Sequence, residues 1–273
     1  MVKFKSILPK IFLILVLIVL YTPIIFVIVY SFSGTTNFTF PRGFTLEGYS
    51  AIFTSGSRGK LFDSLKNTII LALVSSVIST IIGSISAVGI YYMKPKVRLM
   101  VENVNQLPII NSEIVMAVSL MLFFVTFKFP PGWTRLIIAH VTFCTPYVIL
   151  SVMPRLMQMD PNVYEAALDL GANPIKALFK VIIPMVMPGI ISGAAMAFTI
   201  SLDDFIITQI NKGATTGIDT LSTYLYSSTK SASGFAAYWY PVFSIIILIV
   251  VTIVLVGNYV KFRREKTKKS GGK

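Results

Sequence analysis

Six long apolar runs divide the chain and leave it few ways to fold. They occupy about residues 11–32, 67–92, 109–127, 136–153, 185–208 and 241–260. A helix needs about 20 apolar residues to cross the hydrocarbon core of a bilayer. Hydrophobic residues make up 55% of the chain and charged ones 13%, which is too apolar for an ordinary soluble domain. The sequence therefore predicts an all-α membrane protein with six transmembrane helices in residues 1–260, followed by a basic tail, 261–273.

Positive charge is distributed unevenly between the two sides that six spans define. Such spans place both termini on one side, together with the polar loop 155–184. That side carries twice as many of the 24 Lys and Arg residues as the other. Lys and Arg are enriched on the cytoplasmic side of membrane proteins. We therefore expect a multi-pass protein of the bacterial cytoplasmic membrane with both termini in the cytoplasm. Its basic tail would face anionic lipid rather than nucleic acid.

The residues that the chain lacks exclude several kinds of functional site. One cysteine, Cys144, and one histidine, His140, cannot form an internal disulfide, a cysteine zinc cluster or a multi-histidine metal centre. We interpret His140 as a hydrogen-bonded interior side chain. No G-x-x-x-x-G-K-[S/T] run is present to cradle nucleotide phosphates. The sequence therefore predicts no catalytic residue, no metal and no cofactor bound by this chain.

A polar segment between the fourth and fifth apolar runs predicts two short helices joined by a turn. Asp160 can cap the first helix, and Gly171 can close it in the left-handed conformation that glycine accepts best. Asn173 can cap a second helix, which Pro184 would interrupt before the next apolar run. From the residues alone, this segment is either a docking element or an ordinary loop. A DNA-binding helix-turn-helix is disfavoured, because few basic residues flank the segment and spans bracket it closely.

The residue pattern of this segment is also a sequence motif typical of a protein family. Residues 165–167 read Glu-Ala-Ala, Gly171 follows after three residues, and after nine more residues 181–184 read Val-Ile-Ile-Pro. This spacing resembles the EAA loop of ABC importer permeases, which prefer Ile at position 181 and Leu at position 183. The resemblance covers most of the chain, and the run 201–205 resembles the permeases of spermidine/putrescine importers. It implies the type I ABC importer permease (MetI-like) fold. It also assigns coupling to ATPase subunits to Glu165, Ala166, Ala167, Gly171 and Pro184.

The resemblance also implies what the chain works with. The expected partners are a second, related permease in a heterodimer, two ATP-binding subunits, and an extracellular or periplasmic substrate-binding protein, all at a lipid membrane. ATP and Mg²⁺ would bind to the partner ATPase subunits, so this chain would be a non-catalytic subunit. The expected substrate is a polyamine such as spermidine or putrescine. Other small solutes, including ferric ion and phosphonates, stay open, as do an ATP-independent secondary transporter, a channel and a scaffold.

Three carboxylates are candidates for the substrate pathway or its gate. Asp203 and Asp204 lie late in the fifth apolar run, and Glu113 lies near the start of the third. An aspartate at the centre of a membrane costs roughly 2.5–3.5 kcal/mol on insertion scales. An adjacent pair is therefore more readily explained beside a cavity that attracts a cation. The other interpretation ends the span near Ile200 and leaves both aspartates in the outer headgroup region. For Glu113, capping a helix start is an equal alternative.

Overall fold

The computed structural model describes residues 2–33, 43–54, 56, 58–214, 216–230 and 238–270, and these contain helices and turns but no strand. The last residues of the predicted tail, 271–273, lie outside the described residues. The chain divides into two compact units. The first comprises Met1–Gly59 and Ser227–Lys273, and the second is Lys60–Tyr226. The predicted all-α architecture is confirmed in the part of the chain that the structure describes.

Two long helices and a short one form the first unit. Helix α1 (Val2–Ser31) contacts α12 (Trp239–Ser270), which also contacts the short α2 (Glu47–Thr54). The ring centroids of Tyr30 and Tyr240 lie 5.4 Å apart, between α1 and α12. No residue in the most apolar window of α1 is buried inside the chain. Within the first unit, α1 therefore leaves its apolar surface uncovered.

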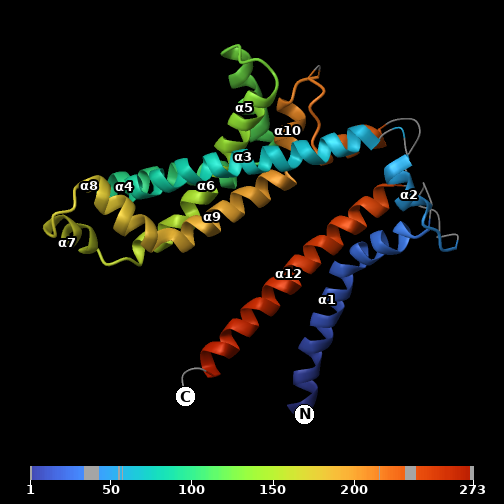
Figure 1. The fold of residues 1–273 in the computed structure, drawn as a ribbon, viewed down its shortest axis with the longest axis horizontal. Coiled ribbons are helices and arrows are strands. Elements are labelled where there is room, and N and C mark those ends of the chain that lie inside the picture. Colours follow the sequence, from blue (N-terminus) through green and yellow to red (C-terminus); the bar gives the residue numbers. More distant parts are fainter. Residues whose placement is uncertain are drawn as a thin grey trace. The chain divides into compact units, whose positions relative to one another are not determined.

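The remaining helices lie wholly or mostly in the second unit. In chain order these are α3 (Arg58–Tyr91), α4 (Pro95–Ile110), α5 (Glu113–Thr126), α6 (Trp133–Met157), α7 (Val163–Asp169), α8 (Pro174–Ala177), the π-helix η1 (Leu178–Ile182), α9 (Ile183–Asp203), α10 (Ile206–Asn211) and α11 (Leu221–Thr229). Helices α6 and α9 lie side by side, and α10 lies against α5 (Figure 1). The loop that contains α7 and α8 joins α6 to η1 and α9, so α6 and α9 form a hairpin.

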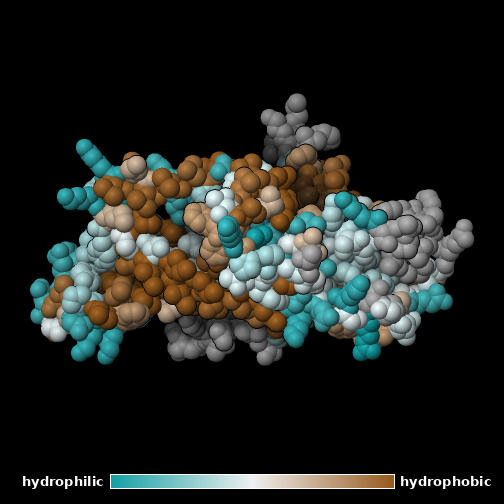
Figure 2. Space-filling model, turned by 90° about the horizontal axis from the view of Figure 1, so that it is seen from above, coloured by the Kyte–Doolittle hydropathy of each residue, from teal (hydrophilic) through white to brown (hydrophobic). Residues whose placement is uncertain are grey.

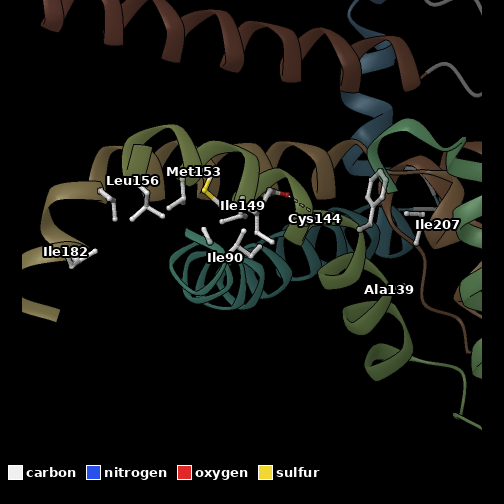
Figure 3. Packing of buried hydrophobic residues seen from close by; sticks show 14 of the residues in the cluster. Ile90, Ala139, Cys144, Ile149, Met153, Leu156, Ile182 and Ile207 are labelled. Carbon is white, nitrogen blue, oxygen red and sulfur yellow. Dashed lines mark hydrogen bonds between the residues drawn. The ribbon is translucent and has the colours of Figure 1, made fainter. Parts of the chain in front are cut away.

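Glycines let α9 approach α6 closely. A Cβ atom added at Gly193 would lie 3.1 Å from Val148 Cγ1, and one at Gly189 would lie 2.8 Å from Arg155 Cγ. Small residues permit such close crossings of helices in membranes. A row of buried apolar side chains follows α6 from Ala139 to Leu156 (Figure 3). The hairpin of α6 and α9 is therefore closely packed.

The single cysteine of the chain lies within this row. The Cys144 side chain is fully buried, and its sulfur lies 3.5 Å from the main-chain oxygen of Ala197 on α9 (Figure 3). Cysteine behaves in such a place as a small apolar side chain with a weak S–H donor. Cys144 therefore belongs to the packing between α6 and α9.

Four helical segments are long and apolar enough to cross a membrane. Among the described residues these are Pro9–Ser31, Arg58–Tyr91, Trp133–Met157 and Pro174–Asp203. Helices α4 and α5 pass the same test only together, with a bend of 104° between them, and Trp239–Thr252 forms a shorter apolar helix. These helices are compatible with the six predicted spans, whose number stays a prediction.

The third predicted run differs most from its expected form. The sequence predicts a connecting segment over 97–108 and one helix over 109–127, whereas the structure makes Pro95–Ile110 a helix and begins another at Glu113. Asn111 and Ser112 are extended, with ψ of 150° and 136°, so the helical hydrogen-bond ladder stops there. Periodicity in the apolar side chains does not report such a backbone break.

Candidate functional site

The loop between α6 and α9 begins with a short helix that ends at glycine, as the sequence predicts. Gly171 has a φ of +85°, its N–H donates to Leu168 O, and the next amide, of Ala172, donates to Ala167 O. This pair of bonds is the Schellman arrangement, which satisfies the last carbonyls of a helix. Before α7, Asp160 accepts from the Asn162 amide at 2.9 Å. The predicted cap at Asp160 is therefore wrong: α7 begins at Val163 with Asn162 at the N-cap and no side-chain capping bond, and only its glycine end is closed as predicted.

The second short helix begins at Asn173, also as predicted, but it is not interrupted at Pro184. The Asn173 side chain accepts from the Lys176 amide at 2.8 Å. From Pro174 the helix continues without a gap through η1 into α9. The predicted interruption at Pro184 is therefore wrong. The wider π turn explains why the helix continues through Pro184. Ile183 N–H donates to Leu178 O, five residues back, and this widened turn directly precedes Pro184, whose ring would crowd an α-helical turn.

The surface of this loop is apolar in places where a soluble surface would be polar. Leu170 is 89% exposed, Ile175 69% and Phe179 60%. Glu165 and Ala166 are exposed, whereas Ala167 is buried beneath them. Figure 2 shows hydrophilic side chains gathered at the end of the second unit that carries α7 and α8, with apolar surface over its middle. Large apolar side chains that are exposed on a polar segment are typical of a protein interaction site.

Glu165 also lines a pocket of about 650 Å³ at the junction of α3, α4 and α7. The Tyr92 and Tyr164 rings lie 5.3 Å apart at this junction. Arg98 is held on one wall, because its Nε donates to Glu102 at 2.8 Å and its guanidinium lies over the Tyr91 ring. The loop therefore rests on an ordered platform, and the Glu165 carboxylate has no hydrogen bond or ion pair to the described residues.

At the other end of the hairpin, α9 stops at the pair of aspartates. Asp203 is its last residue, and Asp204 is extended, with a ψ of 132°. The Asp204 carboxylate accepts from the Ile207 amide at 3.1 Å, the Thr208 amide at 2.9 Å and the Thr208 hydroxyl at 2.8 Å. Aspartate is favoured at a helix start because it satisfies such free amides. Asp204 therefore fixes the start of α10, and the fifth apolar run is broken within the membrane-spanning length that the sequence predicts.

His140 joins this network from α6. Its Nδ1 lies 2.7 Å from Ser201 Oγ, and its Nε2 lies 3.0 Å from Thr208 Oγ1 and 3.5 Å from Asp204 Oδ2. All four residues are buried. The interpretation of His140 as a hydrogen-bonded interior side chain is confirmed. What the sequence did not indicate is its connection to Asp204, 64 positions further along the chain. The helix-capping pattern of Asp204 ahead of Ile207 and Thr208 was the only available signal.

The three predicted pathway carboxylates have different surroundings. Asp204 is buried, whereas Asp203 and Glu113 are exposed. Glu113 lies in the first turn of α5, where its charge is favourable. Within the described part of the chain, no hydrogen bond or ion pair joins any two of the three, and no group of three His, Cys, Asp or Glu side chains could hold a metal ion. Asp203 and Glu113 thus stay candidates for contact with a passing solute, and Asp204 is engaged elsewhere.

Residues 79–265 match the family of binding-protein-dependent transport system inner membrane components. The chain belongs to this family. It is a multi-pass permease subunit of an ABC importer, and ATP hydrolysis belongs to separate subunits. The predicted family is therefore confirmed.

Two curated relatives are similar over most of the chain. The spermidine/putrescine transport system permease protein PotC of Shigella flexneri is 32% identical over 255 residues, which cover 93% of this chain and 92% of that protein. The putrescine transport system permease protein PotI of Escherichia coli (strain K12) is 31% identical over 222 residues, covering 77% and 76%.

Solved structures support the fold. One is a bacterial ABC transporter involved in the import of the acidic polysaccharide alginate, with a TM-score of 0.71 at 16% identity over 95% of this chain and 96% of that one. Another is the inward-facing MetNI methionine ABC transporter, with a TM-score of 0.58 at 18% identity over 76% and 97%. The predicted type I importer permease fold is confirmed.

Proposed function

We propose that this chain is a permease subunit of a polyamine importer, with spermidine or putrescine as the solute. The observation that carries the proposal is its similarity to PotC and PotI along most of its length. An exposed aspartate, Asp203, at the helix break supports it, because a carboxylate in a poorly screened path attracts a cation. Ferric ion and phosphonates are the competing solutes.

The α7–α8 loop is the proposed docking element for an ATP-binding subunit. Its exposed apolar side chains, Leu170, Ile175 and Phe179, supply a surface that a partner can cover. The Glu165 carboxylate lies free beside them and would attract a basic side chain. Two such ATP-binding subunits would bind ATP and Mg²⁺, and this chain would bind neither. The loop and both termini would then lie in the cytoplasm.

The rest of the proposed assembly follows from what this chain leaves uncovered. Helix α1 has no buried residue in its apolar window, so a second permease, with lipid, would pack against it. A heterodimer with a related permease is the proposed arrangement. A substrate-binding protein would deliver the polyamine at the surface near α10. Closure of the ATP-binding subunits would move the loop and switch the pathway between inward-facing and outward-facing states.

Uptake of radiolabelled spermidine and putrescine into proteoliposomes tests the proposal. The vesicles would contain this chain with its co-purifying partners, with and without internal ATP and an external binding protein. Uptake that needs both is expected. ATP hydrolysis stimulated only by a binding protein loaded with another solute would overturn the polyamine proposal. Uptake by this chain alone, without ATP, would overturn the proposed mechanism.

The docking proposal has its own test. Glu165→Lys is expected to abolish co-purification of the ATP-binding subunits, because it reverses the charge offered to them. Asp63→Lys is the matched control: it reverses an exposed charge on α3, about 40 Å from Tyr91 at 1.5 Å per helical residue. Equal co-purification of both variants would contradict docking through Glu165.

A further inference from the structure

The buried chain of hydrogen bonds at the end of the α6–α9 hairpin links three helices that the backbone does not hold together. We infer that His140, Ser201, Thr208 and Asp204 form a joint that transmits movement of the α7–α8 loop to α10 and α5. These residues are buried and act as positioning residues, so the inference needs no direct contact between them and the solute. The inference rests on the proposed coupling of this permease to ATP-binding subunits.

The first step is that the hairpin moves as one piece. Gly189 and Gly193 bring α9 against Arg155 and Val148 of α6, where an added Cβ would lie 2.8 Å and 3.1 Å from the nearest side-chain atoms. Close-packed helices shift between discrete arrangements and deform little within each. The loop joins α6 to α9 at one end of the hairpin. A push on the loop is therefore carried to the other end.

The second step concerns the break after α9. A continuous helix would carry the movement onward through its own hydrogen bonds, but Asp204 is extended and ends that ladder. Helix α10 is only six residues long and cannot be held by its own backbone alone. The side chains must supply the rigid connection. Asp204 supplies part of this connection, because its carboxylate accepts hydrogen bonds from the Ile207 and Thr208 amides at the start of α10.

The third step is the direction of the hydrogen bonds. The Thr208 hydroxyl has one proton, and it donates this proton to Asp204 Oδ2. The Thr208 oxygen must then accept from His140 Nε2–H, which leaves Nδ1 to accept from the Ser201 hydroxyl. When Asp204 is a carboxylate, each group in this series of hydrogen bonds therefore has a single role as donor or acceptor. A fully satisfied buried network specifies a single geometry, and this one ties α6 and α9 to α10.

The fourth step extends the connection to α5. The Asn211 side chain at the end of α10 donates to Ala117 O on α5 at 3.1 Å, and Ile207 belongs to the same apolar cluster as Ala117. Helix α5 begins at Glu113, after the 104° bend from α4. The hairpin, α10 and α5 therefore form a continuous physical path from the coupling loop to the helix break and beyond it.

The test separates loss of transmission from loss of structure. Thr208→Val keeps the shape of the side chain and removes the hydroxyl that joins His140 to Asp204. Thr142→Val is the matched control, because Thr142 is exposed on α6 and its hydroxyl bonds only to Ile138 O of its own helix. Both are compared with wild type as assembled complexes in proteoliposomes, with ATP hydrolysis and polyamine uptake measured in the same vesicles.

Uptake per ATP hydrolysed is expected to fall about fivefold or more in Thr208→Val, within the usual range of coupling between sites, and to stay unchanged in Thr142→Val. His140→Gln, which keeps one donor and one acceptor, is expected to show a smaller fall. A general folding defect would lower uptake and hydrolysis together and leave their ratio intact. An unchanged ratio in Thr208→Val overturns the inference.

A second measurement does not depend on the solute. Fluorophores on Met157→Cys, at the loop end of α6, and on Ala214→Cys, just after α10, would report movement when ATP and Mg²⁺ are added; both positions are exposed, and the native Cys144 is buried. In Thr208→Val the signal at 157 is expected to persist and the signal at 214 to be lost. Persistence of both signals overturns the joint. Failure of polyamine uptake alone overturns only the proposed solute.

Discussion

The two ends of the α6–α9 hairpin are built in opposite ways. At the loop end, Leu170, Ile175 and Phe179 are exposed, and Glu165 has no partner in the described part of the chain. At the opposite end, where α9 breaks at Asp204 (the break end), the polar groups of Asp204 and His140 are buried and hydrogen-bonded to neighbours in the same chain. In the proposed assembly the loop end would be covered by an ATP-binding subunit, whereas the polar groups at the Asp204 end already have partners within the chain. The same hairpin therefore has an uncovered surface at one end and a buried hydrogen-bonded network at the other.

The largest effect on stability is expected from Asp204→Ala. It leaves the Ile207 amide and the Thr208 amide and hydroxyl without their acceptor, and each buried unsatisfied group costs about 1–3 kcal/mol. The free energy of unfolding should therefore fall by about 3 kcal/mol or more, which would appear as a large drop in the thermal unfolding midpoint of the purified complex. Asp203→Ala is the control. Equal midpoints for the two variants would remove the contrast between the adjacent aspartates.

A smaller effect is expected at the loop end from Gly171→Val. A side chain at a φ of +85° costs about 1–2 kcal/mol, and the penalty is conformational because no atom lies within 4 Å of an added Cβ. Co-purification of ATP-binding subunits should weaken, since α8 would be redirected. Gly171→Asn, which tolerates this conformation, should retain most of it. If valine and asparagine behave alike, the geometry of Gly171 is not what the partner requires.

Asn173→Ala should cost about 1 kcal/mol, the usual value of a lost helix cap. The Lys176 amide then loses its acceptor at 2.8 Å. Hydrogen exchange should speed up in α8 and leave α10 unchanged, which would show that the two ends of the hairpin are independent in local stability. Asn173→Asp, which preserves the acceptor, should exchange at the wild-type rate. Faster exchange in α10 would show instead that the loop end supports the break end.

The smallest change in stability is expected from Asp203→Asn, within about 0.5 kcal/mol, as for exposed substitutions in general. Asp203 is exposed and the described residues offer it no hydrogen bond or ion pair. Its effect should appear in transport, as a higher KM for spermidine uptake with the complex fully assembled. An unchanged KM would place Asp203 outside the path of the cation.

The sequence predicted the parts of the fold that depend on local chemistry. Apolar runs located the long apolar helices but not α4, which was predicted as a connecting segment. Gly171 and Asn173 marked helix ends because φ and capping are properties of single residues and their neighbours. It did not predict the π turn before Pro184 or the bend at Asn111, since both depend on the hydrogen bonds of the whole backbone.

The candidate site was predicted unevenly for the same reason. The loop signature lies within twenty consecutive residues and could be identified as a unit. Asp203 and Asp204 look equivalent in sequence, and only the contact of Asp204 with His140 and Thr208 separates them. The bonds from Thr208 are local and follow a capping pattern, whereas the contact with His140 joins residues 64 positions apart, and no pattern of spacing encodes it.

The π turn η1 gives the chain a place where length and rotation are adjusted separately. Each residue of an α-helix turns the following side chains by about 100°, so adding one residue to a straight helix would rotate every later contact. In η1, Ile183 N–H bonds to Leu178 O, and the widened turn takes up one extra residue. Gly189 and Gly193 of α9 can thus keep facing α6, while the turn at Gly171 independently sets the orientation of α8 toward the proposed partner.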